Sequence, residues 1–169
     1  MSSTLESSKK RGDSVESAVI NADPGLEFVG DSVATWHDAR TVECLDPSYE
    51  RPFYGIPLIE PDTEVEIKGA CVVRSAGASR QRSGQWYIKR KAHDQLVDAG
   101  GVYLLTVYAP RPETPILRSV IIPASLLDEH LGGRWYDVDA DRSETEVAQL
   151  TWTVLIDRER VPSSAEVSG

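Results

Sequence analysis

The sequence predicts a single α/β domain with a mixed central β-sheet flanked by helices. The chain has 169 residues, of which 40% are hydrophobic, so it can form one domain with a core of its own but hardly two. A charged strand at residues 64–74, an amphipathic helix at 88–99 and an apolar strand at 102–109 follow one another closely. This strand, helix, strand succession favours a mixed sheet packed by helices.

Residues 1–24 and 161–169 are predicted to be disordered tails on either side of a domain at 25–160. Both segments have few large apolar residues, so they bury too little surface to offset the entropy lost on ordering. The chain has neither a run of about 18 apolar residues nor a leader with a basic and then an apolar part. We therefore expect a soluble, cytoplasmic protein without a membrane partner.

The first strand is predicted at residues 32–42 and is followed by a connecting loop at 44–54. A hairpin comes next, in which residues 55–60 lead into a turn at 61–63 and residues 64–74 return as a strand. Because successive strand residues point to opposite faces, Val65 and Ile67 should anchor one face. Glu64, Glu66 and Lys68 should then share the other, exposed face.

Residues 75–84 form a Gly-, Ser- and Arg-rich segment without periodicity, which indicates a loop. Apolar residues then recur at helical spacing from Ile88 to Ala99, and Gly100 and Gly101 supply a helix stop. Farther on, the sequence indicates a strand at 116–122, a helix at 124–131 ended by two glycines, and a final strand at 149–156.

Charge is distributed unevenly along the chain. The 27 acidic and 18 basic residues give a net charge of −9, and this acidic balance resembles that of proteins from salt-loving archaea. Residues 70–93 nevertheless contain no acidic residue and hold a basic strip of Arg74, Arg80, Arg82, Lys89, Arg90 and Lys91. Together with His93 on the same helix, this strip is a candidate nucleic-acid interface. The alternative is a solvated loop and helix face.

Glu66 and Lys68 are the residues that point to a chemistry. On a strand they lie side by side, roughly 6.5–7 Å apart at their α-carbons. Phosphodiester hydrolysis needs carboxylates that bind Mg²⁺ and a cation near the attacking water. Two cysteines without a CxxC pair suggest neither a disulfide framework nor a zinc ribbon, and the absence of GxxxxGK[ST], GxGxxG and GxSxG argues against nucleotide-driven motors, Rossmann enzymes and α/β-hydrolases.

The order of segments adds a family resemblance. A Trp-Xaa-Asp-Ala segment at 36–39 precedes Val-Glu-Ile-Lys at 65–68, the Arg-rich loop, the helix and the apolar strand. This order resembles the PD-(D/E)xK nuclease superfamily, particularly restriction-endonuclease-like and Holliday-junction-resolvase-like proteins of archaea and their viruses. The resemblance implies a restriction-endonuclease-like fold in which Asp38 and Glu66 bind Mg²⁺ or Mn²⁺ and Lys68 positions the water.

The sequence departs from the family's pattern at the position of the metal-binding aspartate. In compact members of the family it lies across the hairpin from the glutamate, but about Pro57 would face Glu66 here, and proline cannot bind a metal. Asp62 matches the family's Pro-Asp dipeptide, yet it would sit at the hairpin tip. Asp38 lies on a candidate strand that could pair beside 64–74, so we expect Asp38 to supply the ligand. An ordinary exposed acid is the alternative for Asp38.

The resulting hypothesis is a metal-dependent DNA endonuclease or resolvase. The alternatives are a catalytically inactive nuclease-fold module that binds DNA or a protein partner, and an interaction protein with no nucleic-acid role. The sequence does not distinguish duplex, branched and single-stranded substrates, and it leaves a homodimer open.

Overall fold

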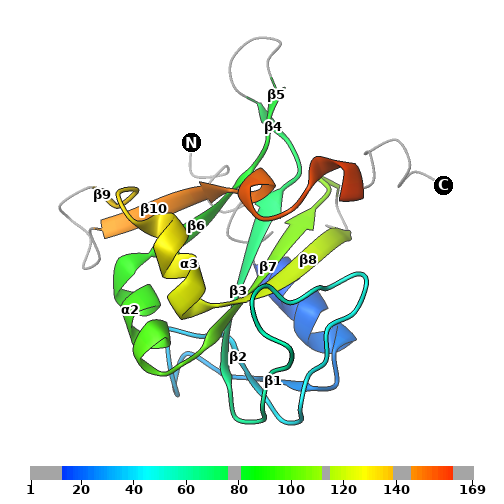
Figure 1. Cartoon of the computed structure of the whole chain (residues 1–169), viewed down its shortest axis with the longest axis vertical. Coiled ribbons are helices and arrows are strands. Elements are labelled where there is room, and N and C mark those ends of the chain that lie inside the picture. The colour runs from blue at the N-terminus through cyan, green and yellow to red at the C-terminus, as the bar shows by residue number, and fades with distance from the viewer. Residues whose placement is uncertain (1–12, 76–80, 112–114, 139–145, 162–169) are drawn as a thin grey trace.

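A five-stranded mixed sheet forms the centre of the computed structural model, which describes residues 13–75, 81–111, 115–138 and 146–161 (Figure 1). In spatial order the strands are β1 (Leu26–Phe28), β2 (Ala39–Thr41), β3 (Glu64–Cys71), β7 (Val102–Tyr108) and β8 (Ile116–Pro123). β3 and β7 run parallel and the other neighbours antiparallel. The predicted α/β fold with a mixed sheet is thereby confirmed.

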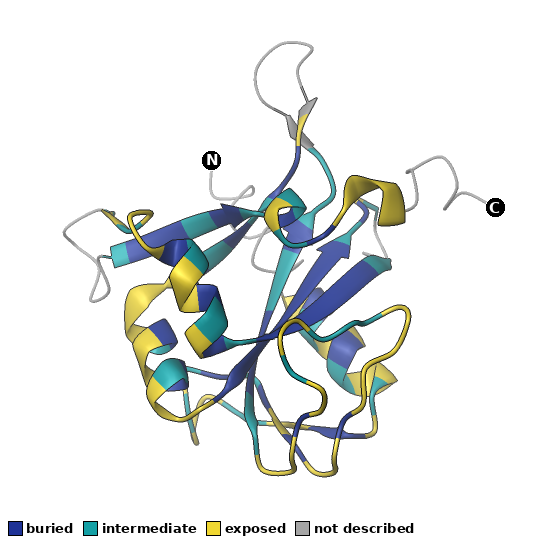
Figure 2. Ribbon diagram, viewed as in Figure 1, coloured by how far each residue is buried: buried dark blue, intermediate teal, exposed yellow. Residues whose placement is uncertain are grey.

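The sheet buries both of its faces. Along β7, Tyr103 and Leu105 join one hydrophobic core, and Val102 and Leu104 join the other. Figure 2 shows β7 and β8 buried over most of their length. A buried central strand explains why residues 102–109 read as a continuous apolar run.

The first core is covered by two helices and a second sheet. The helices are α2 (Arg90–Asp98) and α3 (Ala124–Leu131), and the second sheet has the order β6 (Gln85–Lys89), β10 (Glu146–Thr151), β9 (Tyr136–Asp137). Their apolar faces pack together through Trp86, Leu96 and Leu127, none of which is exposed. The short pair β4 (Arg74–Ser75) and β5 (Gln81–Arg82) projects from the body (Figure 1), and short 3₁₀ turns at Trp152–Val154 and Arg158–Arg160 follow β10.

The second core is covered by a helix where the sequence predicted a disordered tail. Residues 13–22 are helical, and Val15 and Val19 lie buried in this core. Their four-residue spacing is that of one helix face, and Ile20 packs beside them, so the segment docks through a narrow apolar face. Residues 1–12, and 162–169 of the predicted C-terminal tail, lie outside the described residues.

The predicted hairpin is absent, and β3 pairs with β2 instead. Ala39 lies opposite Val65 in an antiparallel ladder, so Pro57 does not face Glu66. The segment between the two strands is held by isolated bridges from Leu45 to Ile59 and from Phe53 to Ile121. The first strand is also much shorter than the predicted 32–42.

The remaining elements match the expected order with shifted ends. The predicted helix at 88–99 starts at Arg90, because Ile88 belongs to β6 and pairs with Ala148. At its end the Gly101 amide donates to Leu96 O and the Gly100 amide to Val97 O, with Gly100 at φ 71°. This left-handed glycine cap is the predicted stop. None of the helices in the described ranges is long and apolar enough to cross a membrane.

Gly84 marks the junction of the two sheets. Its amide donates to Cys71 O at 3.0 Å, and a Cβ built on Gly84 would lie 2.0 Å from that oxygen. The Trp152 indole reinforces the junction by donating to Val72 O at 3.0 Å. A side chain at position 84 would therefore force the end of β3 away from the second sheet.

We expect Gly84→Ala to lower the free energy of unfolding by about 2 kcal/mol or more, because the overlap involves backbone that cannot yield. Gly132→Ala is the matched control, since its Cβ would have 3.9 Å of clearance to the nearest atom. Urea denaturation of both variants measures the difference. Equal stability of the two would contradict the close contact.

Candidate active site

A polar cleft of about 420 Å³ opens beside β3, next to the point where β2 begins. Residues from five parts of the fold meet there: the N-terminal helix, the segment before β2, β3, the β6–α2 junction and β7. The lining residues are Glu16, Thr35, Asp38, Glu66, Lys68, Lys89, Lys91, Ala92, Gln95 and Tyr103. The cleft thus contains Asp38, Glu66 and Lys68, the three residues singled out as catalytic candidates from the sequence.

β3 places Glu66 and Lys68 side by side. Val65 and Ile67 are buried in the second core, so the alternation of the strand turns Glu66 and Lys68 to the opposite face. Lys68 Nζ lies 3.8 Å from Glu66 Oε1. Contrary to the expected exposed face, Glu66 is only 6% exposed, because Tyr103 of the parallel strand β7 lies beside it in the sheet register.

Asp38 is held against the edge of β3 by two hydrogen bonds. Its amide donates to Val65 O at 2.9 Å, which extends the β2–β3 ladder by one position. Its carboxylate oxygen Oδ2 then accepts the Ile67 amide at 2.8 Å. The carboxylate therefore takes the place of a continuing strand, and it is fixed in the cleft beside Glu66.

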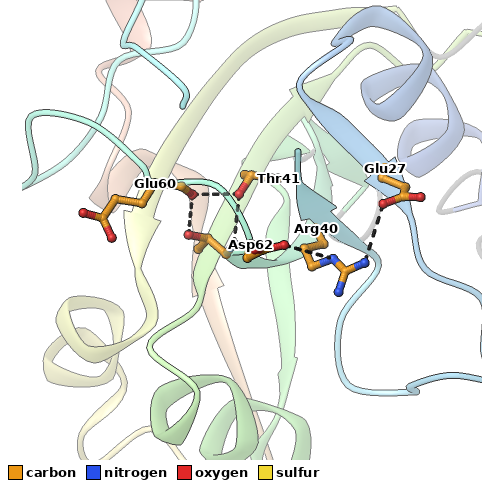
Figure 3. Close-up of polar contacts among 6 residues, drawn as sticks. Glu27, Arg40, Thr41, Glu60 and Asp62 are labelled. Carbon is orange, nitrogen blue, oxygen red and sulfur yellow. Dashed lines mark hydrogen bonds and ion pairs between the residues drawn. The ribbon is translucent and has the colours of Figure 1, made fainter. Parts of the chain in front are cut away.

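Asp62 lies in the turn before β3 and does not line the cleft. The residue has φ 62° and is exposed, and its carboxylate faces Arg40 Nε at 3.9 Å (Figure 3). Thr41 stabilises this turn by donating its hydroxyl to Glu60 O and accepting the Thr63 amide. Of the two candidate aspartates, only Asp38 is next to Glu66.

Glu16 lines the cleft, although its segment was predicted to be a disordered tail. It lies on the N-terminal helix next to Val15, which packs against Gly69 of β3. Burial and the negative charge of Asp38 raise the pKa of Glu16 to about 7, although Lys68 opposes the shift. The spacing of Val15 and Val19 was the sequence signal that could have identified this helix.

The carboxylates fit a divalent cation. Burial raises the pKa of Glu66 well above its ordinary value; Lys68 opposes this shift, and the Asp38 carboxylate adds to it. Two acids packed so closely with one lysine would be stabilised by additional positive charge. Within the described ranges no three His, Cys, Asp or Glu side chains converge to hold a metal, and Asp38 and Glu66 are a pair of neighbouring carboxylates in the cleft. Mg²⁺ commonly uses one or two carboxylates and keeps several waters, which suits this pair.

The basic strip is divided by the structure. Lys89 and Lys91 line the cleft, whereas Arg90 between them pairs with Glu146 and lies 5.3 Å over the Trp135 ring. Arg82 is exposed on β5, and Arg74 belongs to β4. Arg80 lies outside the described residues. The cleft therefore draws its positive charge from Lys68, Lys89 and Lys91.

His93 is wrongly placed in the predicted nucleic-acid interface. It is 0% exposed, with Nδ1 2.8 Å from the Tyr103 hydroxyl and Nε2 2.8 Å from Asp128 Oδ1. Because a carboxylate only accepts, Nε2 carries a hydrogen, and in a neutral ring Nδ1 accepts from Tyr103. His93 thus ties α2 to β7 and α3 beneath the cleft, where it cannot touch a phosphate.

Comparisons with known proteins agree with this geometry. A family model described as a PD-(D/E)XK nuclease superfamily domain matches residues 1–157. No curated protein and no solved structure matches the chain. The chain belongs to this superfamily, and the match confirms the resemblance drawn from the order of segments at the level of the superfamily.

The raised pKa of Glu16 predicts a pH dependence of stability in the absence of metal. Relative to its ordinary value of 4.5, the folded-state pKa of about 7 favours the protonated form. The associated stability is full below 4.5 and is lost as pH rises through 7. Glu16→Gln should reduce the stability lost between about pH 5 and pH 8 by on the order of 1 kcal/mol, after allowing for solvent screening.

Urea unfolding in the presence of a chelator at both pH values measures this effect. Glu129→Gln is the control, because Glu129 is exposed on α3 and does not line the cleft. A Glu16→Gln profile that parallels the wild-type profile would show that Glu16 is solvated.

Proposed function

Because the chain belongs to the PD-(D/E)XK nuclease superfamily, we propose that it is a metal-dependent DNA nuclease that hydrolyses phosphodiester bonds in the cleft. The observation that carries this proposal is the Asp38 carboxylate, which is hydrogen-bonded to the Ile67 amide between Glu66 and Lys68. That bond assembles an acid, a second acid and a cation on one strand edge.

Each of these residues has a role that follows from its surroundings. Asp38 and Glu66 would hold Mg²⁺ or Mn²⁺, which supplies polarisation of the phosphoryl oxygen and a more acidic bound water. Lys68 is partly exposed beside Glu66 and can donate to the attacking water and to the negative charge that develops on the phosphate. Tyr103 and its buried partner His93 keep the floor of the cleft rigid.

Lys89 and Lys91 are proposed to bind the DNA backbone beside the reacting phosphate. Both line the cleft at the start of α2, so they place positive charge next to the carboxylates. This local charge explains how a chain with a net charge of −9 could bind a polyanion.

The binding-only alternative rested on Pro57 lying opposite Glu66. Since Asp38 occupies the place beside Glu66, a potential ligand is present, and we favour the catalytic proposal. The hypothesis also includes resolvase or endonuclease specificity and a homodimer. The geometry of the cleft supports neither of these parts over its alternatives.

Asp38→Asn should remove Mg²⁺-dependent DNA cleavage and weaken Mg²⁺ binding by at least about 100-fold. The amide oxygen can still accept the Ile67 hydrogen bond, so the variant should fold while lacking the charge that binds metal. Asp62→Asn, which alters an exposed turn, is the matched control and should cleave at close to the wild-type rate. Cleavage of labelled DNA and calorimetric titration of Mg²⁺ test both variants. Wild-type cleavage by Asp38→Asn would refute the assigned site.

Lys89→Ala and Lys91→Ala should each weaken duplex binding and reduce the slope of log affinity against log salt by roughly 0.9, if each lysine contacts one phosphate. Arg90→Ala is the control, because Arg90 is engaged with Glu146 and Trp135 away from the cleft. Binding is measured without divalent metal over a range of salt concentrations. A larger effect from Arg90→Ala than from either lysine variant would move the interface to the opposite side of α2.

A further inference from the structure

A second hollow adjoins the cleft and shares Glu16 and Asp38 with it. This groove, of about 560 Å³, runs between the N-terminal helix and the end of β1. The volume lies within the range of sites that enclose small organic groups. Whatever binds in the groove therefore lies directly beside the two carboxylates at the edge of the proposed reaction centre.

Phe28 is the most unusual residue of the groove. Leu26, two positions earlier on the same strand, is buried in the second core, but Phe28 is 67% exposed. Its backbone is fixed, since Phe28 pairs with Ala39 and the next amide, Val29, donates to Asp38 O at 2.9 Å. An aromatic ring is thus exposed to solvent on the strand whose backbone also contacts Asp38.

The charge of the groove restricts its ligand. Asp13 and Asp31 line it together with Glu16 and Asp38, and no Lys or Arg is among its described lining residues. A phosphate would be repelled there, in contrast to the lysine side of the cleft. Ile20 and Phe28 give the groove apolar surface, which a hydrated metal ion would not use.

A nucleobase satisfies these conditions. It is flat and uncharged, so it can stack on an aromatic ring, and every base offers such a face. The amino groups of adenine and cytosine donate hydrogen bonds, which carboxylates accept. Cleft and groove together then suit a single nucleotide strand. Its phosphates would lie on the lysines of the cleft, and one base would lie in the acidic groove against Phe28.

We propose that the groove is a subsite for an unpaired nucleobase that stacks on Phe28, so that the substrate is single-stranded or locally unpaired DNA. This inference rests on the proposed nuclease function, since it specifies the substrate of the same site. A base inside an intact duplex is already stacked and paired, and it would have to leave the helix to reach Phe28.

The direct test is the binding of short single-stranded oligonucleotides that carry 2-aminopurine at successive internal positions, in the presence of chelator. Wild-type protein should change the fluorescence at one position in particular, where the base stacks on Phe28. Phe28→Ala should abolish that change and weaken binding by roughly tenfold or more. Phe28→Trp should restore both, because a larger aromatic ring keeps the stacking surface.

Tyr49→Ala is the matched control. Tyr49 is 77% exposed and lies over Arg118 of β8, at the opposite edge of the sheet from β1. Its removal should leave both the affinity and the fluorescence unchanged. Fully paired duplex should bind equally well to the wild type and to Phe28→Ala.

The outcomes separate this inference from the nuclease proposal. Position-specific fluorescence that depends on Phe28 supports the subsite even if no DNA is ever cut. Metal-dependent cleavage that requires Asp38, together with equal single-strand binding by wild type and Phe28→Ala, would overturn the subsite and leave the nuclease intact. An equal loss of affinity in Phe28→Ala and Tyr49→Ala would also overturn the subsite, because non-specific binding to exposed aromatic rings would then explain the result.

Discussion

The hydrogen bond from the Ile67 amide to the Asp38 carboxylate is the contact on which the site depends. β2 begins only at Ala39, opposite Val65, so β3 would otherwise present an unpaired amide at Ile67 in a partly buried position. The side chain satisfies this amide and at the same time becomes immobile beside Glu66. A structural requirement of the strand edge and the placement of a candidate metal ligand are therefore met by the same bond.

The cost of this arrangement is electrostatic. Glu66 is buried next to Asp38, Glu16 approaches from the N-terminal helix, and burial raises the pKa of both glutamates. Gly69 permits that approach, because a Cβ there would lie 3.2 Å from Val15 Cγ1. Lys68 only partly offsets the crowded negative charge. A cleft of this kind has a physical reason to bind a cation, and its stability should respond to one.

Rigidity beneath the cleft comes from buried hydrogen bonds. His93 connects Tyr103 to Asp128 and thereby fixes α2 against the sheet. The start of α2 then directs Lys89 and Lys91 to the cleft and Arg90 to the other side. The cleft and the adjoining groove therefore have lysines at one end, and acids with the exposed Phe28 ring at the other. Such polarity would orient a nucleotide strand more strongly than the net charge of the chain suggests.

The sequence by itself determined the elements whose signals are local. The alternation around Glu66, the apolar run of β7 and the glycine stop after α2 were all readable, because strand period, helix period and glycine conformation are properties of neighbouring residues. Only the tertiary structure decided that Ala39 pairs with Val65, that Glu16 joins the cleft and that His93 is buried. A three-residue strand and a short helix docked by a few apolar residues carry little periodic signal, and burial depends on chain segments far away in the sequence. The sequence favoured Asp38 over Asp62 as the residue beside Glu66. The long-range pairing of β2 with β3 is what places the Asp38 side chain there.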